Sequence, residues 1–318
     1  MNYITDIHQV NTSKLSTLMT ASLQAYNAFS DKHPAVCQSA AIKPPAGFVC
    51  VTCWTGIDSL FTHDKTEEIF GVVFRSKQAP YTYIFAFRGT ASILDILDDL
   101  GAEHRSFKPY DAKQHVSSEV EAEAGFYDIY TEQTATVKPM QQQLFELLDQ
   151  YQQSDKPIAE LWITGHSLGS SLSTLFSLDV GLSRPDIRAT NINFACPRTG
   201  NQAFVDLFEQ TLKPHNTLRV QNTYDAVPCV PLEDMGYAHT PWALLLAFYE
   251  KGFIDQANLL ARHSALNYQA VINCAKQSSS GVCLNDDLHD KDNGDQLVSV
   301  QPSSSNLCEF YLAHSKTD

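Results

Sequence analysis

The strongest constraint on the fold is one stretch in which a strand, a tight turn and a helix follow one another without a linker. Strand-favouring residues run from Glu160 to Thr164, and a helical pattern of apolar residues extends from Ser170 to Leu182. Between them, Gly165 and Gly169 flank Ser167, each two positions away. This G-x-S-x-G pattern is typical of a strand-to-helix turn that projects a serine side chain from the edge of a parallel sheet.

Strand and helix patterns alternate along most of the chain. We expect helices over residues 14–29, 137–151, 170–182 and 202–212, and strands over 69–75, 81–88, 159–164, 190–196 and 217–222. The first two strands are separated only by the polar segment SKQAP and predict an antiparallel hairpin. The later strands are joined by helices, and such crossovers predict a mainly parallel central sheet with helices on both faces.

The composition restricts the possible partners. Hydrophobic residues make up 43% and charged residues 18% of the 318 residues, so we expect a folded globular protein. The net charge is −14, from 22 basic and 36 acidic residues, and no Lys/Arg cluster could follow a phosphate backbone. Nucleic acid is therefore not expected as a partner, and any membrane contact would have to be apolar.

The N-terminal sequence predicts no secretory leader. MNYITDIHQVNTSKL lacks both a basic segment and an apolar core, and so does not resemble a Sec signal peptide. The longest apolar run, Trp242–Phe248, is too short to span a bilayer. We therefore expect a soluble protein that is cytoplasmic, or exported by a route without a Sec signal peptide.

A change in composition near Ala275 predicts a boundary between a main domain, residues 1–275, and an extension, residues 276–318, that is rich in Ser and Asp and partly packed. Within this extension only residues 306–312, NLCEFYL, are apolar enough to pack. The acidic segment 289–296, HDKDNGDQ, does not fit the register of an EF-hand loop, so we interpret it as a solvated loop.

Eight cysteines leave three interpretations open. They stand at positions 37, 50, 53, 196, 229, 274, 283 and 308. Free structural thiols are our first interpretation, and one or two disulfides among 37/50/53 and 274/283/308 are the second. A metal or redox centre comes last, because Cys50-x-x-Cys53 has no second Cys/His pair at zinc spacing.

A nucleophilic serine needs an imidazole to accept its proton and a carboxylate to orient that imidazole. Catalytic groups in parallel sheets lie beyond the carboxyl ends of the strands. Asp225 follows the strand expected to end near Asn222, in the segment NTYDAVPCVP, and it also follows Ser167 in the chain. We therefore choose Asp225 as the orienting acid, in the chain order Ser, Asp, His.

Four motifs together resemble the class 3 (fungal-type) lipase family of α/β-hydrolases. They are YIFAFRGT, EAGFYDIY, GHSLG and NTYDAVPCVP, and the resemblance extends from about Leu15 to Ala275. It implies an α/β-hydrolase fold, a Ser-His-Asp triad without a cofactor or metal, and hydrolysis of lipid or other carboxylic esters.

The resemblance also implies roles for individual residues. Thr90, after the glycine of FRGT, and the N–H of Leu168 would form the oxyanion hole. The base is assigned to His263, which opens HSALNYQ at a position similar to that of the family's histidine, while His239 and His289 remain alternatives. We interpret His166 as packing beside the nucleophile rather than carrying a proton, because a neighbour on a tight turn points away from the serine.

The segment after Thr90 resembles the position of a lid in such lipases. In ASILDILDDLGAEHRSF, residues 91–107, apolar and acidic residues would lie on opposite faces of a helix that follows the strand ending at Arg88. One hypothesis is a lid that turns its apolar face toward a lipid interface. The alternative is a plain surface helix with its apolar side on the core.

The sequence therefore predicts a carboxylic ester hydrolase that acts on acylglycerols or similar lipids, with Ser167 as the nucleophile. A phospholipase A1 and an esterase for short or feruloyl esters are alternatives with the same chemistry. A catalytically silent hydrolase fold that serves as a binding module is a different class, and the eligible serine, aspartate and histidines argue against it.

Overall fold

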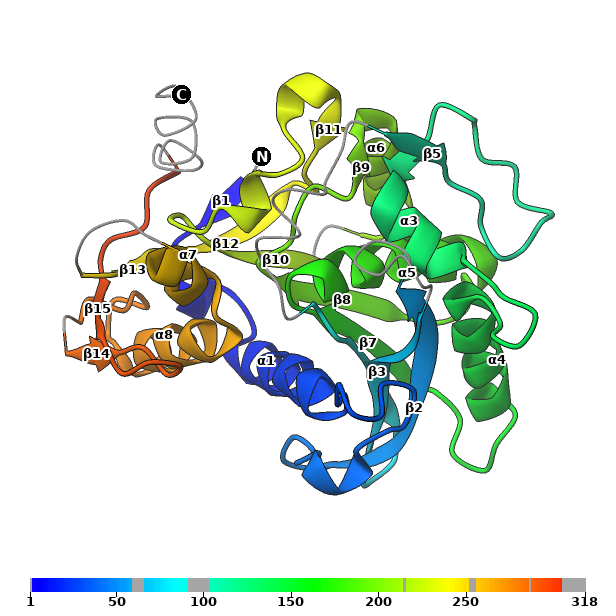
Figure 1. The fold of residues 1–318 in the computed structure, drawn as a ribbon, viewed down its shortest axis with the longest axis horizontal. Helices are drawn as coiled ribbons and strands as arrows, with labels where there is room; N and C mark the ends of the chain where they lie inside the picture. The colour runs from blue at the N-terminus through cyan, green and yellow to red at the C-terminus, as the bar shows by residue number, and fades with distance from the viewer. Residues whose placement is uncertain are drawn as a thin grey trace.

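A central sheet of eight strands organises the molecule (Figure 1). The computed structural model describes residues 2–58, 66–90, 103–213, 216–251, 256–285 and 287–304. In order across the sheet the strands are β1 (Asn2–Ile4), β12 (Trp242–Leu246), β10 (Thr217–Asn222), β8 (Ala189–Phe194), β7 (Glu160–Gly165), β4 (Thr82–Phe87), β3 (Thr66–Ser76) and β2 (Phe48–Asp58).

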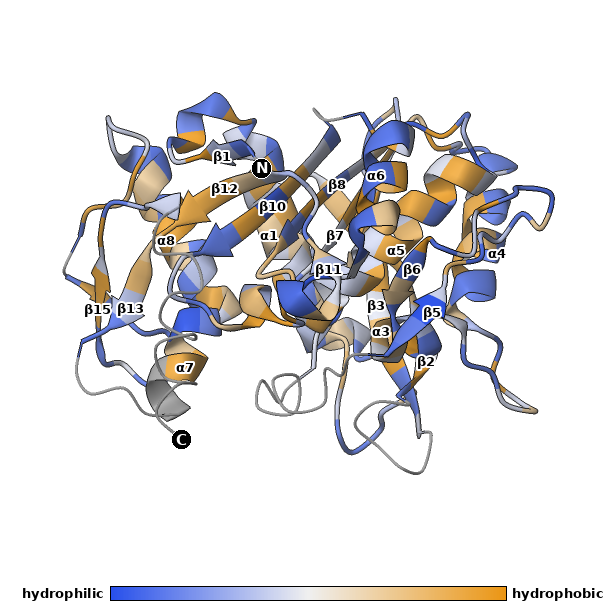
Figure 2. Ribbon diagram, turned by 90° about the horizontal axis from the view of Figure 1, so that it is seen from above, coloured by the Kyte–Doolittle hydropathy of each residue, from blue (hydrophilic) through white to orange (hydrophobic). Residues whose placement is uncertain are grey.

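The pairing confirms the predicted mainly parallel sheet. In the order across the sheet, the adjacent strands β1, β12, β10, β8, β7 and β4 all pair in parallel. Strand β3 pairs antiparallel with β4 and forms the predicted hairpin. The sheet is wider than predicted, because β1, β2 and β12 were not expected as strands. The apolar run at Trp242–Phe248 contributes β12, which is hydrophobic along its length in Figure 2.

Seven helices within the described residues accompany the sheets. They are α1 (Thr12–Asn27), α3 (Ala124–Thr131), α4 (Met140–Gln152), α5 (Leu168–Ser183), α6 (Gln202–Thr211), α7 (Gln256–His263) and α8 (Ala265–Gln277). The four helices predicted from the sequence correspond to α1, α4, α5 and α6. None of the described helices combines the length and apolar character that crossing a bilayer requires.

Two hydrophobic cores lie on opposite faces of the sheet. Along β4, Phe85 and Phe87 pack into the cluster formed with α3, α4, α5 and α6, whereas Ile84 and Ala86 face the cluster formed with α1 and α8. This alternation follows from the period of two in a strand. Both faces are therefore covered, and the carboxyl ends of the parallel strands are the edge at which side chains can project for chemistry.

Two small antiparallel sheets complete the described structure. One contains β11 (Tyr237–Ala238), β9 (Gly200–Asn201), β6 (Glu121–Glu123) and β5 (His104–Ser106), and the other contains β13 (Phe248–Glu250), β15 (Gln296–Ser299) and β14 (Leu288–His289). The second of these joins the C-terminal segment to the main body, because β15 pairs with β13.

This C-terminal segment corrects two predictions. Val282, Cys283 and Leu297 are buried, so packing is not confined to residues 306–312, which lie outside the described residues. The acidic segment 289–296 is not uniformly solvated either, because Asp290 is only 4% exposed and accepts hydrogen bonds. The division at Ala275 stays a prediction.

The first interpretation of the cysteines is wrong for most of those described. Cys37 is bonded to Cys53 and Cys274 to Cys283, and Cys229 is also disulfide-bonded. Cys50 and Cys196 are free. The fold brings the paired cysteines together. The segment before β2 folds back onto that strand and places Cys37 beside Cys53, and the turn after α8 folds back onto that helix and places Cys283 beside Cys274.

Candidate active site

The turn between β7 and α5 holds Ser167 in a strained conformation. Its backbone has φ 59° and ψ −133°, a positive φ that non-glycine residues seldom adopt outside functional turns. A Cβ on Gly165 would lie 2.1 Å from the carbonyl oxygen of Gly169, and one on Gly169 would lie 2.5 Å from that of Phe87. Both positions therefore require glycine for the strand and helix to meet this closely.

The loop after β4 approaches the same turn. A Cβ on Gly89 would lie 2.6 Å from the carbonyl oxygen of His166 and 3.1 Å from Cβ of Ser167, so only glycine fits. Thr90 follows at once and lines the same cavity as Ser167. Leu168 is the first residue of α5, where N–H groups of the first turn lack partners within the helix. The two predicted oxyanion donors thus flank the serine.

Asp225 and His263 come together from distant parts of the chain. Nδ1 of His263 lies 2.8 Å from Oδ2 of Asp225, and both residues are buried. Asp225 is fixed further by the hydroxyl of Tyr268, which donates to Oδ2 at 2.8 Å, and by the N–H of Val227, which donates to Oδ1 at 3.0 Å. Because Nδ1 faces a carboxylate, it carries the hydrogen, and Nε2 is left to accept a proton.

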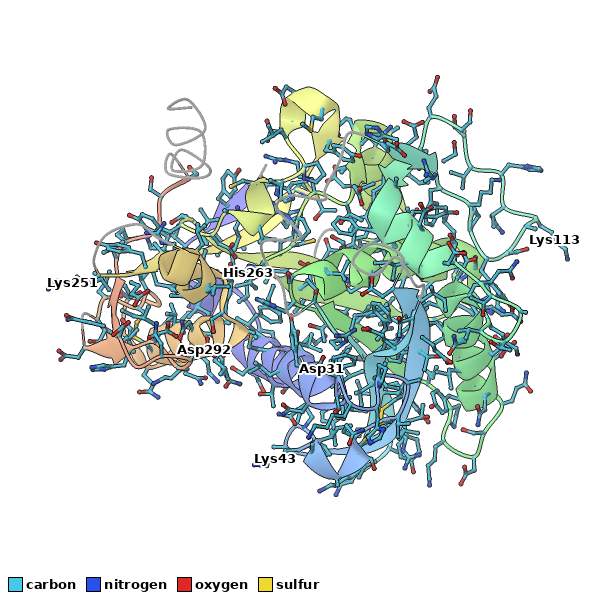
Figure 3. All side chains as sticks on the ribbon, viewed as in Figure 1. Asp31, Lys43, Lys113, Lys251, His263 and Asp292 are labelled. Atoms are coloured by element: carbon cyan, nitrogen blue, oxygen red, sulfur yellow. A yellow bond between two sulfur atoms is a disulfide. The ribbon has the colours of Figure 1, made fainter. Side chains whose placement is uncertain are left out.

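Ser167 and His263 face one cavity of about 610 Å³. Oγ of Ser167 and Nε2 of His263 are both buried, and neither has a hydrogen-bond partner among the described residues. Hydrogen bonds between catalytic groups are often long or poorly aligned without substrate. Figure 3 shows His263 near the middle of the molecule and also labels Asp292, another residue that lines the cavity.

His166 is held rigidly and stays neutral. Its Nε2 lies 2.8 Å from the backbone carbonyl oxygen of His263, which can only accept, so Nε2 carries the hydrogen. Nδ1 therefore accepts from the hydroxyl of Tyr26 at 2.9 Å, and the Tyr26 oxygen accepts the N–H of Gly89. Burial, followed by the neighbouring His263, holds the pKa of His166 well below its usual range.

The other candidate bases lie elsewhere. His239 is buried against the carbonyl oxygen of Pro228, at 2.6 Å from Nε2, and burial holds its pKa well below the usual range. His289 is exposed and contacts the backbone oxygen of Asp287. Neither lines the cavity at Ser167. Most of the predicted lid, residues 91–102, lies outside the described residues.

Several contributors to the site were not predicted, among them Tyr26 and Asn222. Tyr26 lies in the first helix and reaches His166 across 140 positions of sequence. Asn222 ends β10, and its Nδ2 donates to the backbone oxygens of Phe248 and Arg262, both at 2.9 Å. Nothing in the local pattern marks either residue, because each acts through a contact that exists only after the chain has folded.

The described residues contain no group of three or more His, Cys, Asp or Glu that could hold a metal ion. The arrangement at Ser167 consists of a serine on a strained turn, an imidazole oriented by a buried carboxylate, and N–H donors beside the serine. This is the architecture of an α/β-hydrolase with a serine at the nucleophile position.

Comparison with known proteins agrees with that class. Residues 84–235 match the family described as lipase (class 3). Lipase II from Rhizopus niveus has the same fold, with a TM-score of 0.56, 21% sequence identity, and coverage of 75% of this chain and 82% of that one.

Curated relatives include enzymes with different named substrates. A chloroplastic phospholipase A(1) from Arabidopsis thaliana is 31% identical over 194 residues, which cover 59% of this chain and 40% of that protein. A secreted mono- and diacylglycerol lipase from Malassezia globosa is 32% identical over 160 residues, 49% of each chain. The chain thus spans about half the length of the curated relatives it matches.

Proposed function

We propose that this protein is a carboxylic ester hydrolase that acts through an acyl-enzyme formed on Ser167. Oγ of Ser167 attacks the ester carbonyl while Nε2 of His263 takes its proton, and the same nitrogen then returns the proton to the leaving alcohol. Water, activated by His263, next cleaves the acyl-enzyme. The observation that carries the proposal is the 2.8 Å contact between Nδ1 of His263 and Oδ2 of Asp225, with His263 and Ser167 lining the same cavity.

The oxyanion would be held by the N–H of Leu168 and by Thr90, through its N–H and hydroxyl. Both residues adjoin Ser167, and donors fixed beside the reacting carbonyl stabilise the negative charge that develops on its oxygen. Removing one such donor typically costs about 2.7–4 kcal/mol of transition-state stabilisation. No cofactor is needed for this sequence of steps.

The cavity supports an uncharged lipid ester as the substrate. Leu23, Leu260 and Leu266 give it apolar contacts, and the last two are 49% and 39% exposed. Its polar contacts include Thr20, Gln269 and the carboxylate of Asp292, and none of the described lining residues is Lys or Arg. A phosphate head group would therefore meet no cation there, which favours acylglycerols over phospholipids.

The compartment follows from the cysteines. Disulfides form and persist in oxidising environments and are rare in reducing cytosol. With Cys37–Cys53 and Cys274–Cys283 paired, we propose that the protein works in an oxidising compartment rather than in the cytoplasm.

A lid formed by residues 91–102 remains part of the proposal, because this segment directly follows Thr90 in the chain and its sequence is amphipathic. A lid that opens at an interface predicts a jump in hydrolysis rate when a substrate passes from dissolved to emulsified form. A rate that simply follows substrate concentration across that transition would remove the lid from the proposal.

The test of function is hydrolysis of matched dioleoyl substrates, diacylglycerol and phosphatidylcholine, with soluble p-nitrophenyl esters of several chain lengths. We expect the wild type to release fatty acid from diacylglycerol and less from phosphatidylcholine. Ser167→Ala should release none from either substrate. A Ser167→Ala variant with full activity would contradict the proposed chemistry. Faster release from phosphatidylcholine would keep the chemistry but assign a phospholipase.

A further inference from the structure

Helix α7 carries His263 as its last residue, and its C-terminal end is fully hydrogen-bonded. The last four carbonyl groups of a helix have no partner within the helix and need donors from elsewhere. The first of these in α7, at Leu260, accepts the backbone N–H of Ser264 at 2.9 Å. The other three accept from side chains.

Each of those three donors comes from a different element. The carbonyl oxygens of Ala261, Arg262 and His263 accept, in that order, from Nδ2 of Asn267 at 2.9 Å, Nδ2 of Asn222 at 2.9 Å and Nε2 of His166 at 2.8 Å. All three donor residues are buried. The backbone that presents the imidazole is therefore fixed from α8, from the end of β10 and from the turn beside Ser167.

Asn267 is in turn held by the C-terminal segment. Its second Nδ2 hydrogen is donated to Oδ1 of Asp290 at 2.8 Å, and its Oδ1 accepts the N–H of Lys291 at 2.9 Å. Both Nδ2 hydrogens and the Oδ1 oxygen of Asn267 are therefore hydrogen-bonded, and the residue is 0% exposed. Oδ1 of Asp290 also accepts the N–H of Asp292 at 2.9 Å, which closes the loop around it.

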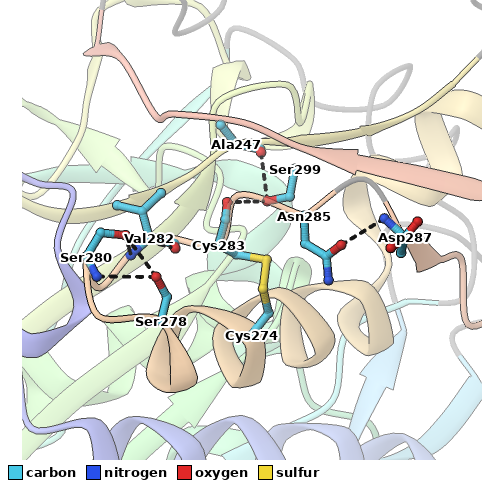
Figure 4. The surroundings of a disulfide bond; sticks show 9 residues. All are labelled: Ala247, Cys274, Ser278, Ser280, Val282, Cys283, Asn285, Asp287 and Ser299. Carbon is cyan, nitrogen blue, oxygen red and sulfur yellow. Dashed lines mark hydrogen bonds between the residues drawn. A yellow bond between two sulfur atoms is a disulfide. The ribbon is translucent and has the colours of Figure 1, made fainter.

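The segment that carries Asp290 is anchored to the body of the protein on both sides (Figure 4). Before it, the Cys274–Cys283 disulfide joins the chain to α8. After it, β15 pairs with β13, and the hydroxyl of Ser299 contacts the backbone oxygens of Cys283 and Ala247 at 2.9 and 3.3 Å. This segment lies beyond residues 84–235, which match the family.

We propose that the C-terminal segment, residues 287–299, is a positioning element of the active site, and that it acts through the Asp290–Asn267 pair on the backbone of His263. The inference rests on the proposed function, because it assumes that His263 is the base. Asp290 and Asn267 are positioning residues: neither lines the reacting serine, and each acts through the end of α7.

The pair is suited to this task because α7 has only eight residues. A short helix has little rigidity of its own, and its position is set by the groups bonded to its ends. Loss of the bond at Ala261 would let the helix end and the imidazole shift, and a displacement of about 1 Å can lower a rate by about 100-fold. Such a loss acts chiefly on kcat, because it displaces the imidazole while Ser167 and the lining residue Leu23 lie outside α7 and stay in place.

The experiment compares Asp290→Ala with Asp290→Asn in the full chain. The asparagine retains the Oδ1 acceptor for Asn267 and should restore activity, whereas alanine removes the acceptor. We expect Asp290→Ala to lower kcat for a p-nitrophenyl ester by about 10- to 100-fold with little change in KM, and to slow fluorophosphonate labelling of Ser167 by a similar factor. Asp287→Ala, an exposed aspartate of the same segment, is the matched control and should retain wild-type rates.

A folded Asp290→Ala variant with wild-type kcat and labelling rate overturns the inference, and so does an equal loss in Asp290→Asn. If Asp290→Ala does not fold by circular dichroism, Asn267→Ser, which shortens the same link and leaves Asp290 in place, is measured instead against the same criteria. An inactive wild-type protein would overturn the proposed function itself, which keeps the two failures distinct.

Discussion

Tyr268→Phe is the substitution whose effect the structure defines most closely. Tyr268 is 0% exposed, its hydroxyl donates to Oδ2 of Asp225 at 2.8 Å, and the same oxygen accepts the N–H of Asn222 at 2.8 Å. The ring also packs edge-on against Phe248, with centroids 5.3 Å apart. Phenylalanine retains the ring and removes the hydroxyl alone.

Two hydrogen bonds are lost in this variant, and both are buried. A hydrogen bond to a charged group contributes about 1.5–3 kcal/mol, and a buried N–H left without a partner costs about 1–3 kcal/mol. We therefore expect the free energy of unfolding to fall by about 2.5–6 kcal/mol. Because Asp225 would lose the hydroxyl of Tyr268 and retain the N–H of Val227 and the imidazole of His263, we also expect kcat to fall by about tenfold, or about 1.4 kcal/mol.

Tyr130→Phe is the matched control. Tyr130 is equally buried and donates to the carboxylate of Asp179 at 2.9 Å, but it does not line the cavity of Ser167. Urea unfolding and ester hydrolysis should show that both variants lose stability and that only Tyr268→Phe loses kcat. Equal catalytic losses in the two variants, or an unchanged unfolding free energy in Tyr268→Phe, would refute this reasoning.

Three further predictions concern stability. Burial raises the pKa of Glu123 from 4.5 to about 7. Between about pH 4.5 and 7 this glutamate ionises in the unfolded chain but stays protonated in the folded protein, so the free energy of unfolding falls by about 3 kcal/mol as the pH rises. Urea unfolding of Glu123→Gln should lack this fall, and an equal pH dependence in the variant and the wild type would contradict the prediction. Gly165→Ala should lose about 3 kcal/mol or more, since its Cβ would lie 2.1 Å from Gly169 O, and a thermal melt like wild type would disprove the clash. Removing Cys37–Cys53, which spans 16 positions, by a double serine substitution should cost about 3 kcal/mol in urea unfolding, and an unchanged midpoint would count against the bond.

The sequence predicts most of the central sheet because its strands and helices have clear periods. That pattern predicts the hairpin of β3 and β4, and it predicts the parallel strands β7, β8 and β10 with the helices that connect them. Strand β2 was missed because its pairing with β3 shifts register between Cys50 and Thr52 and again between Trp54 and Thr55, which disturbs the alternation of apolar residues. Strand β12 was missed because a buried parallel strand reads as a short apolar run.

The site was only partly accessible from the sequence. Ser167, Thr90 and Leu168 belong to local motifs, whereas the choice of His263 over His239 depends on a contact between residues 38 positions apart. The bonds that hold His263 in place, from His166, Asn222 and Asn267, are long-range contacts between backbone and side chain, and no periodicity encodes them. The second interpretation of the cysteines placed disulfides within 37/50/53 and 274/283/308, where Cys37–Cys53 and Cys274–Cys283 lie, but spacing alone does not define which members of a group are bonded.

The central step of the proposed mechanism is that His263 acts as the base for Ser167. The direct measurement is the rate of fluorophosphonate labelling, with the modified residue identified by mass spectrometry, for wild type, His263→Ala and His239→Ala. We predict a single adduct on Ser167, formed at the wild-type rate in His239→Ala and slowed by at least about 100-fold in His263→Ala. Labelling of another residue, or an unchanged rate in His263→Ala, would contradict the account.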